Sequence, residues 1–159
     1  MFVQDFIVVE RPCSEVWRAI VSDAAGILGA STREASEDMA LLEARVGPVG
    51  VPELLRRTVE LSVGPVRHGG DATLIAFSWE SDGALGALFP HFDADLEVAP
   101  FGVDATELSV RGSYDPPGGR VGRNLDRMVL HRLAESTIRA FLGRLATRLV
   151  PPAAGTASD

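Results

Sequence analysis

The chain has 159 residues, of which 46% are hydrophobic and 23% charged, and its formal net charge is −7 at pH 7. This length and composition predict a soluble protein with one domain at residues 1–150. The acidic balance argues against binding to nucleic acid or anionic lipid, which needs a basic surface, and the single cysteine excludes an internal disulfide and favours a reducing, cytoplasmic location.

The N-terminal region begins with a predicted strand at residues 2–10, where Val, Ile and Phe dominate. No basic segment precedes it, so a strand is favoured over a signal peptide. Pro12 ends this strand. Cys13 or Ser14 then caps a short amphipathic helix, and a second short helix is predicted at residues 23–30.

The next region is predicted to return to strands. Residues 31–39 are polar and acidic, which indicates a loop or a frayed helix. A second strand is predicted at residues 41–46 and a third at residues 54–63. The pair Gly64-Pro65 is predicted to end the third strand, because proline cannot donate a ladder hydrogen bond.

Three further strands are predicted at residues 72–80, 92–98 and 105–114. The last two alternate apolar and polar side chains, which is typical of an antiparallel sheet with one buried and one solvated face. Residues 82–90, between the first and the second of these strands, are apolar and contain two glycines, and they form either a gate over a pocket or a buried connection.

The longest periodic pattern is a helix predicted at residues 119–150, followed by a disordered tail at residues 151–159. Its apolar residues recur at helical spacing: Leu130, Ala134, Ile138, Phe141, Leu145 and Leu149. A curved antiparallel sheet wrapped around this helix is the economical α+β arrangement. One helix is too narrow to fill the concave side, so we expect an apolar gap that a ligand could occupy.

Four motifs resemble the helix-grip superfamily, the START-like group of polyketide cyclases, lipid-transfer domains and pathogenesis-related allergens. The motifs are Pro12-Cys13-Ser14-Glu15-Val16-Trp17, Ser78-Trp79-Glu80, Phe89-Pro90 with Ala94-Asp95-Leu96-Glu97-Val98, and Gly112-Ser113-Tyr114-Asp115 with the helical His131-Arg132-Leu133-Ala134-Glu135. The resemblance spans about residues 2–150, and the chain is most similar to uncharacterised bacterial members of the superfamily. It implies topology more strongly than activity, because one fold hosts many functions.

The expected cavity has twelve candidate lining residues: Arg57, Phe77, Trp79, Leu88, Phe89, Phe92, Leu96, Thr106, Leu108, Tyr114, Val129 and Leu133. Tyr114 and Thr106 bring hydroxyls to one strand face. Arg57 lies on an apolar face and either binds a carboxylate or reaches the rim, and Trp79 is either a ligand contact or core.

No metal or cofactor site is predicted. His91, Asp93, Asp95 and Glu97 share one strand face, but their apolar neighbours take the buried face, so solvation is favoured over metal binding. His131 and Glu135 lie one helical turn apart and lack a third ligand. The segment 118–122 lacks the lysine of a phosphate loop, and Cys13 is expected to be a half-buried junction residue rather than a nucleophile.

Three functions follow as hypotheses. The first is binding or transport of a small hydrophobic or amphipathic ligand between helix and sheet. The second is a polyketide cyclase or aromatase-like enzyme that uses Tyr114, Thr106 and Arg57. The third is a partner-binding or stress-response module that docks through Asp93, Asp95 and Glu97.

Overall fold

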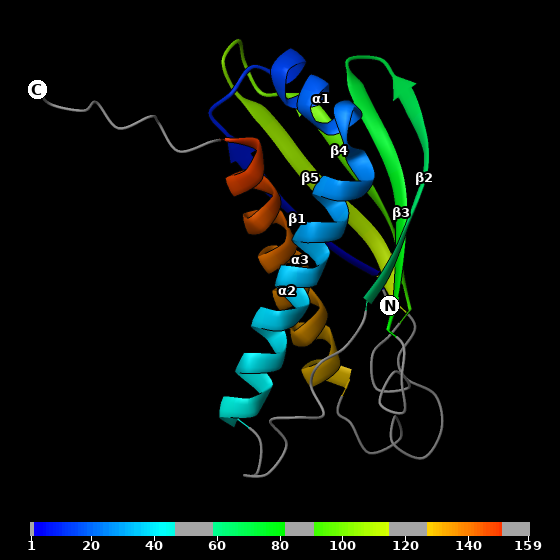
Figure 1. Cartoon of the computed structure of the whole chain (residues 1–159), viewed down its shortest axis with the longest axis vertical. Helices are drawn as coiled ribbons and strands as arrows, with labels where there is room; N and C mark the ends of the chain where they lie inside the picture. Colours follow the sequence, from blue (N-terminus) through cyan, green and yellow to red (C-terminus); the bar gives the residue numbers. More distant parts are fainter. Residues whose placement is uncertain (1, 47–58, 82–90, 115–126, 151–159) are drawn as a thin grey trace, which may run out of the picture.

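The computed structural model describes residues 2–46, 59–81, 91–114 and 127–150. Its sheet contains strands β1 (Phe2–Val9), β2 (Val59–Gly69), β3 (Ala72–Ser81), β4 (Phe92–Pro100) and β5 (Thr106–Tyr114). The order across the sheet is β1-β5-β4-β3-β2, and every neighbouring pair is antiparallel. The sheet curves over helices α1 (Cys13–Ser22), α2 (Ala24–Val46) and α3 (Arg127–Leu149), which all lie on one face (Figure 1).

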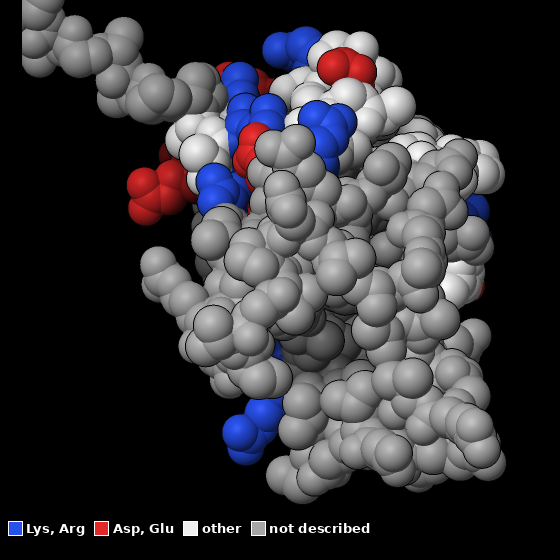
Figure 2. All heavy atoms as spheres, turned by 60° about the horizontal axis from the view of Figure 1, so that its bottom comes forward, with Lys and Arg blue, Asp and Glu red and all other residues white. Residues whose placement is uncertain are grey.

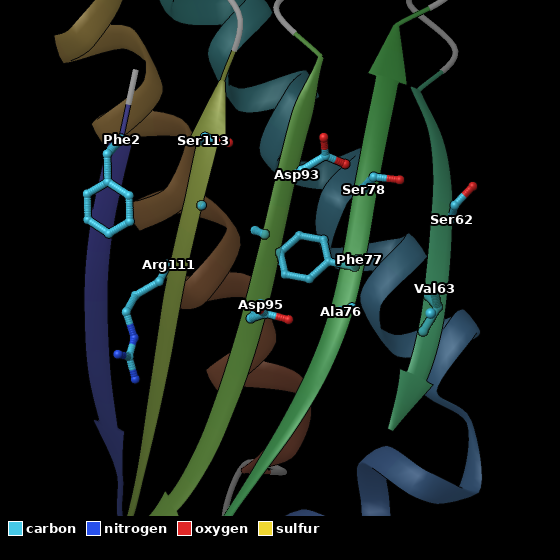
Figure 3. A pocket seen from close by; sticks show the side chains of 13 residues that line it. Phe2, Ser62, Val63, Ala76, Phe77, Ser78, Asp93, Asp95, Arg111 and Ser113 are labelled. Carbon is cyan, nitrogen blue, oxygen red and sulfur yellow. The ribbon is translucent and has the colours of Figure 1, made fainter. Parts of the chain in front are cut away.

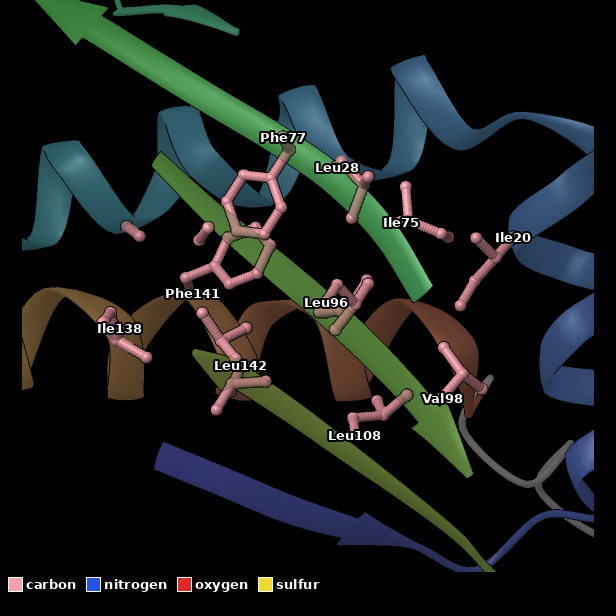
Figure 4. Close-up of a cluster of buried hydrophobic side chains, with 14 of the residues drawn as sticks. Ile20, Leu28, Ile75, Phe77, Leu96, Val98, Leu108, Ile138, Phe141 and Leu142 are labelled. Carbon is pink, nitrogen blue, oxygen red and sulfur yellow. The ribbon is translucent and has the colours of Figure 1, made fainter. Parts of the chain in front are cut away.

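Helix α3 confirms the predicted C-terminal helix and its apolar row over Arg127–Leu149, whereas residues 119–126 of the prediction lie outside the described residues. Ile138, Phe141, Leu145 and Leu149 are buried, at the spacing of three and four residues that places them on one side of a helix. They face the inner sheet residues Leu96 and Leu108 (Figure 4). The predicted α+β arrangement, a curved antiparallel sheet packed on a C-terminal helix, is therefore present.

Helix α2 corrects the sequence prediction. Residues 24–46 form one helix of 23 residues, where a short helix, a loop at residues 31–39 and a strand at residues 41–46 were predicted. The polar residues Ser31 and Thr32 are buried within it. Their hydroxyls donate to the carbonyls of Ile27 (2.8 Å) and Leu28 (2.9 Å), one turn back. Because these bonds satisfy the hydroxyls, the helix buries polar residues without interruption.

Strand β2 corrects a second prediction, because Gly64-Pro65 does not end it. The strand continues to Gly69, with a shift of register between Val63 and Val66. This shift is a β-bulge, and β2 is an edge strand of the described sheet. Proline is tolerated at such a place because its missing N–H interrupts no central ladder.

The two long helices are joined to each other and to the sheet by ion pairs. Glu34 of α2 contacts both Arg148 and Arg144 of α3, the latter at 3.8 Å. Arg139 of α3 pairs with Asp5 of β1 at 3.1 Å. These exposed pairs connect α3 to α2 on one side and to β1 on the other, whereas the burial of its apolar row holds the helix on the sheet.

Arg11 links the C-terminal end of α3 to the start of β5. Its guanidinium donates to the carbonyl of Leu149 at the end of α3, and its own carbonyl accepts a 2.7 Å bond from the buried hydroxyl of Thr106. Cys13 lies half-buried at the same junction, as predicted, and burial raises the pKa of its thiol. A raised pKa disfavours the reactive thiolate.

Candidate functional site

Four aromatic rings join α3 to the inner face of the sheet. Trp79 stacks on Phe92 with ring centroids 4.5 Å apart, and Phe77 stacks on Phe141 of α3 at 5.4 Å. Trp79 also meets Phe141 edge to face at 5.9 Å. Phe77, Phe92 and Phe141 are buried, whereas Trp79 remains partly exposed. We call these four residues the aromatic cluster.

The aromatic cluster lies towards the end of the molecule opposite Arg11. The strand register aligns Trp79 with Phe92 and Phe92 with Tyr114, at the end of β3, the start of β4 and the end of β5. Strands β3 and β5 both end, and β4 begins, at this end of the sheet (Figure 1). Figure 2 is turned to bring this end forward. The arginine and acidic side chains of its described residues lie next to one another, mainly in the upper part of the view.

Tyr114 contributes a phenol at the end of β5. Its side chain is 1% exposed and lies on the inner face of the sheet. Burial raises the pKa of the phenol above its ordinary value, and the negative charge of Glu135 on α3 raises it further. Both effects disfavour the phenolate. The hydroxyl therefore stays protonated and keeps the ability to donate a hydrogen bond.

This pKa can be measured directly, because Tyr114 is the only tyrosine in the chain. We expect phenolate absorbance to develop above the ordinary tyrosine pKa of about 10. The substitution Glu135→Gln should lower the midpoint only part of the way, because burial is the larger cause. Glu107→Gln, on the outer face of the same strand, is the control and should leave the midpoint unchanged.

The same shift makes stability depend on pH. The raised pKa favours the neutral phenol in the folded state, so its contribution is fully present below the unfolded pKa. It is lost as the pH rises from there through the folded pKa. A midpoint at or below that of free tyrosine would contradict the buried, neutral Tyr114.

Thr106 shares the inner face with Tyr114 but lies at the other end of β5. Eight residues of strand separate them by about 27 Å. The Thr106 hydroxyl already donates to the Arg11 carbonyl. One small substrate cannot contact both hydroxyls, which counts against a cyclase-like reaction that uses the pair.

The structure brings some of the other predicted site residues together. Leu96 and Leu108 are fully buried in the core below the aromatic cluster. The structure describes Val129 and Leu133 only as backbone of α3. The remaining predictions lie outside the described residues: Arg57, Leu88, Phe89 and the segment 82–90.

Two residues at this site were not among the sequence candidates. Phe141 supplies the ring of α3 that contacts the sheet, and Glu135 supplies the charge that acts on Tyr114. The signal for Phe141 was available, because it is the single aromatic residue in the apolar row of the predicted helix. Glu135 had been interpreted only as the partner of His131, with which it pairs at 3.3 Å.

The predicted acidic strand face is solvent-facing but paired. Asp95 contacts Arg67 at 2.9 Å, Glu97 contacts Arg111, and Asp93 contacts His91 at 2.9 Å. These local pairs reduce the negative potential that an acidic docking patch needs. Within the described ranges, no group of three or more His, Cys, Asp or Glu residues is arranged to hold a metal ion.

The described part of the chain contains no helix that is both long enough and apolar enough to cross a bilayer. No protein-family model matches the sequence, and no curated protein is similar to it. Solved structures do match, and they cover most of the chain.

A hypothetical protein from Helicobacter pylori aligns with a TM-score of 0.51 and 14% identity, over 94% of this chain and 88% of the other. A conserved protein from Geobacillus kaustophilus aligns with a TM-score of 0.50 and 11% identity, over 94% and 95% of the two chains. An aromatase/cyclase from a Streptomyces species has 14% identity over 98% of each chain, but its TM-score of 0.42 is too low to support an inference about activity. The first two likenesses show the fold alone, and the curved antiparallel sheet packed on a long C-terminal helix agrees with the predicted helix-grip arrangement.

Proposed function

We propose that the protein binds a small hydrophobic or amphipathic molecule on the inner side of the sheet, next to Trp79 and Tyr114. The observation that carries the proposal is the partial exposure of Trp79. This large apolar ring points to the inner face, is packed by three other rings, and still keeps surface open to a further contact. Ligand sites are typically apolar and aromatic, with a few well-placed polar groups.

Tyr114 supports an amphipathic ligand over a purely apolar one. Its protonated phenol lies in register with Phe92 of the aromatic cluster, and a carbonyl or carboxylate oxygen of a ligand would accept its hydrogen bond by replacing the contact that Tyr114 already makes. A ring next to one fixed hydroxyl would orient a chain that has an apolar body and one polar head. Arg11 links α3 to β5 at the opposite end of the sheet, so such a ligand would approach from the Trp79 end.

The two tryptophans allow a direct test, because the chain has only Trp17 and Trp79. Trp17 lies on α1, with its ring 5.3 Å from that of His68, away from the aromatic cluster. In the Trp17→Phe variant, Trp79 is the sole emitter. We expect cis-parinaric acid or 1-anilinonaphthalene-8-sulfonate to quench its emission at micromolar concentration and to saturate.

The matched control is Trp79→Phe, in which Trp17 is the sole emitter and should not respond to the same probes. Equal quenching of both variants would indicate non-specific adsorption. Absence of saturable quenching of Trp79 would also count against the proposal. A denaturant titration of each variant shows that both remain folded during the test.

A further inference from the structure

A groove of about 530 Å³ crosses the outer face of the sheet, opposite the helices. Figure 3 views this face with α2 and α3 behind the sheet; Ser62, Ser78, Asp93, Asp95 and Arg111 lie on the outer face, whereas Phe77, which also lines the groove, belongs to the inner row of β3. The volume lies within the range of known small-molecule sites, about 300–1,000 Å³. Phe77 of the aromatic cluster is also among the residues that line this groove, but Trp79 and Tyr114 are not, so the inference below does not depend on the proposed function.

The groove follows one row of residues that runs across all five strands. The strand register aligns, in order, Ser62 of β2, Ser78 of β3, Asp93 of β4, Ser113 of β5 and Phe2 of β1. At about 4.8 Å per strand, the row spans about 19 Å. An elongated ligand suits such a row better than a compact one.

The hollow exists because the neighbouring side chains are small. Ala76 lies beside Ser78 on the outer face of β3, and Gly64 lies opposite at the bulge of β2. An ideal Cβ on Gly64 would lie 3.2 Å from the Cβ of Ala76. Outer sheet faces usually carry long polar side chains, so this band of small residues leaves the backbone accessible to a ligand.

The chemistry of the row is hydroxyl-rich. Among the described residues, no hydrogen bond engages the hydroxyls of Ser62, Ser78 or Ser113. Each serine hydroxyl can donate one hydrogen bond and accept two. A purely apolar ligand would desolvate these groups without replacing their bonds, which is unfavourable.

The charged residues of the groove favour a neutral ligand. The groove contains two carboxylates, from Asp93 and Asp95, and one guanidinium, from Arg111. This excess of negative charge disfavours an anionic ligand. The carboxylates are paired with His91 and Arg67, which disfavours a simple cation. Each carboxylate still has more acceptor sites than one ion pair uses.

Phe2 provides an apolar platform at one end of the row. Its ring is 62% exposed, on the outer face of the edge strand β1. A flat aromatic surface beside hydroxyl and carboxylate groups matches a sugar ring, which has an apolar C–H face and a rim of hydroxyls that both donate and accept. We propose that this groove binds a neutral oligosaccharide, laid across the strands with one ring on Phe2.

The test uses the full chain and amide NMR spectra. Neutral tri- and tetrasaccharides of glucose, mannose, galactose, xylose and N-acetylglucosamine are titrated to millimolar concentration. We expect at least one to shift the amides of Ser78, Asp93 and Ser113 in a saturable way. The indole N–H signal of Trp79, whose side chain lies on the opposite face, should not move.

Three variants locate the site. Asp93→Asn and Phe2→Ala should each weaken binding about tenfold, which corresponds to about 1.4 kcal/mol. Ala76→Gln, which fills the hollow without removing a hydroxyl or a charge, should abolish binding. Val8→Ala is the control, because it removes an exposed apolar side chain from the same face of β1, at the other end of the strand from Phe2.

The outcomes are distinct. Absence of shifts with every sugar would overturn the proposal, as would equal affinity in Ala76→Gln and the parent chain. Shifts confined to Trp79 and Tyr114 would place the sugar on the inner face and overturn it as well. Loss of binding in Val8→Ala as strong as in Phe2→Ala would show a non-specific apolar effect rather than this groove.

Discussion

Replacement of Phe141 by alanine is expected to lower the free energy of unfolding by about 3–5 kcal/mol, the range for loss of a buried phenylalanine. Phe141 is fully buried and is the ring of α3 that contacts both Phe77 and Trp79. Without it, the helix loses its aromatic contact with the sheet, and a cavity remains between them. A urea titration measures the loss, and Trp79 emission in the Trp17→Phe background should shift towards that of a solvated indole.

Ser136→Ala is the control for this experiment. Ser136 is exposed on the same helix, and surface changes of this kind alter stability by only about 0.5 kcal/mol. If Phe141→Ala cost no more than Ser136→Ala, α3 would not be held to the sheet by the aromatic cluster.

The second large effect is expected at Gly112, where even alanine should destabilise the protein by about 3 kcal/mol. A Cβ at this position would lie 2.5 Å from the carbonyl oxygen of Asp93 and 2.7 Å from both the Cβ of Ala94 and the Cζ of Phe92. The neighbouring strand backbone cannot move away without breaking the β4–β5 ladder. The ring of Phe92, which stacks on Trp79, would also be displaced.

The same substitution at Gly143 is expected to change the stability of the protein in the opposite direction. It lies in α3, and an added Cβ would meet nothing within 4 Å. Gly143→Ala should therefore stabilise the protein by about 0.5–1 kcal/mol, because alanine is the better helix former. Thermal unfolding of both variants compares them directly. A similar change at both positions would show that the close contact of Phe92 with Gly112 is absent in solution.

Much of the fold could be predicted from periodicity. Strand β4 alternates Phe92, Ala94, Leu96 and Val98 with polar residues, and the structure buries all four. The apolar row of α3 is equally regular. Patterns of this kind depend only on which side of an element faces the core, so a sequence displays them directly.

The full length of helix α2 was not predicted, because the polar residues that interrupt its apolar row have partners distant in sequence. Ser31, Thr32 and Glu34 break the apolar row, and they are explained only by the bonds along the helix and by Arg144 and Arg148 of α3. Local propensity held a better signal, since the residues of 38–46 include Met, Ala, Leu, Glu and Arg, which are good helix formers.

The candidate site was less predictable than the fold. Trp79, Phe77 and Phe92 could be placed on the inner face, but contact with Phe141 depends on the position of α3 along the sheet. The separation of Thr106 from Tyr114 follows from strand length and could have been calculated. The outer groove required the register of all five strands, which no single segment of sequence encodes.

The order of elements along the chain also has a consequence for synthesis on the ribosome. The sheet is complete at Tyr114, whereas α3, which covers Leu96, Leu108 and Phe77, ends at Leu149. At translation rates of about 5–20 residues per second, the synthesis of α3 is completed roughly 2–7 seconds after that of β5. During that interval an apolar surface is open to other nascent chains, so we expect production of this protein to depend on chaperones that bind before translation ends.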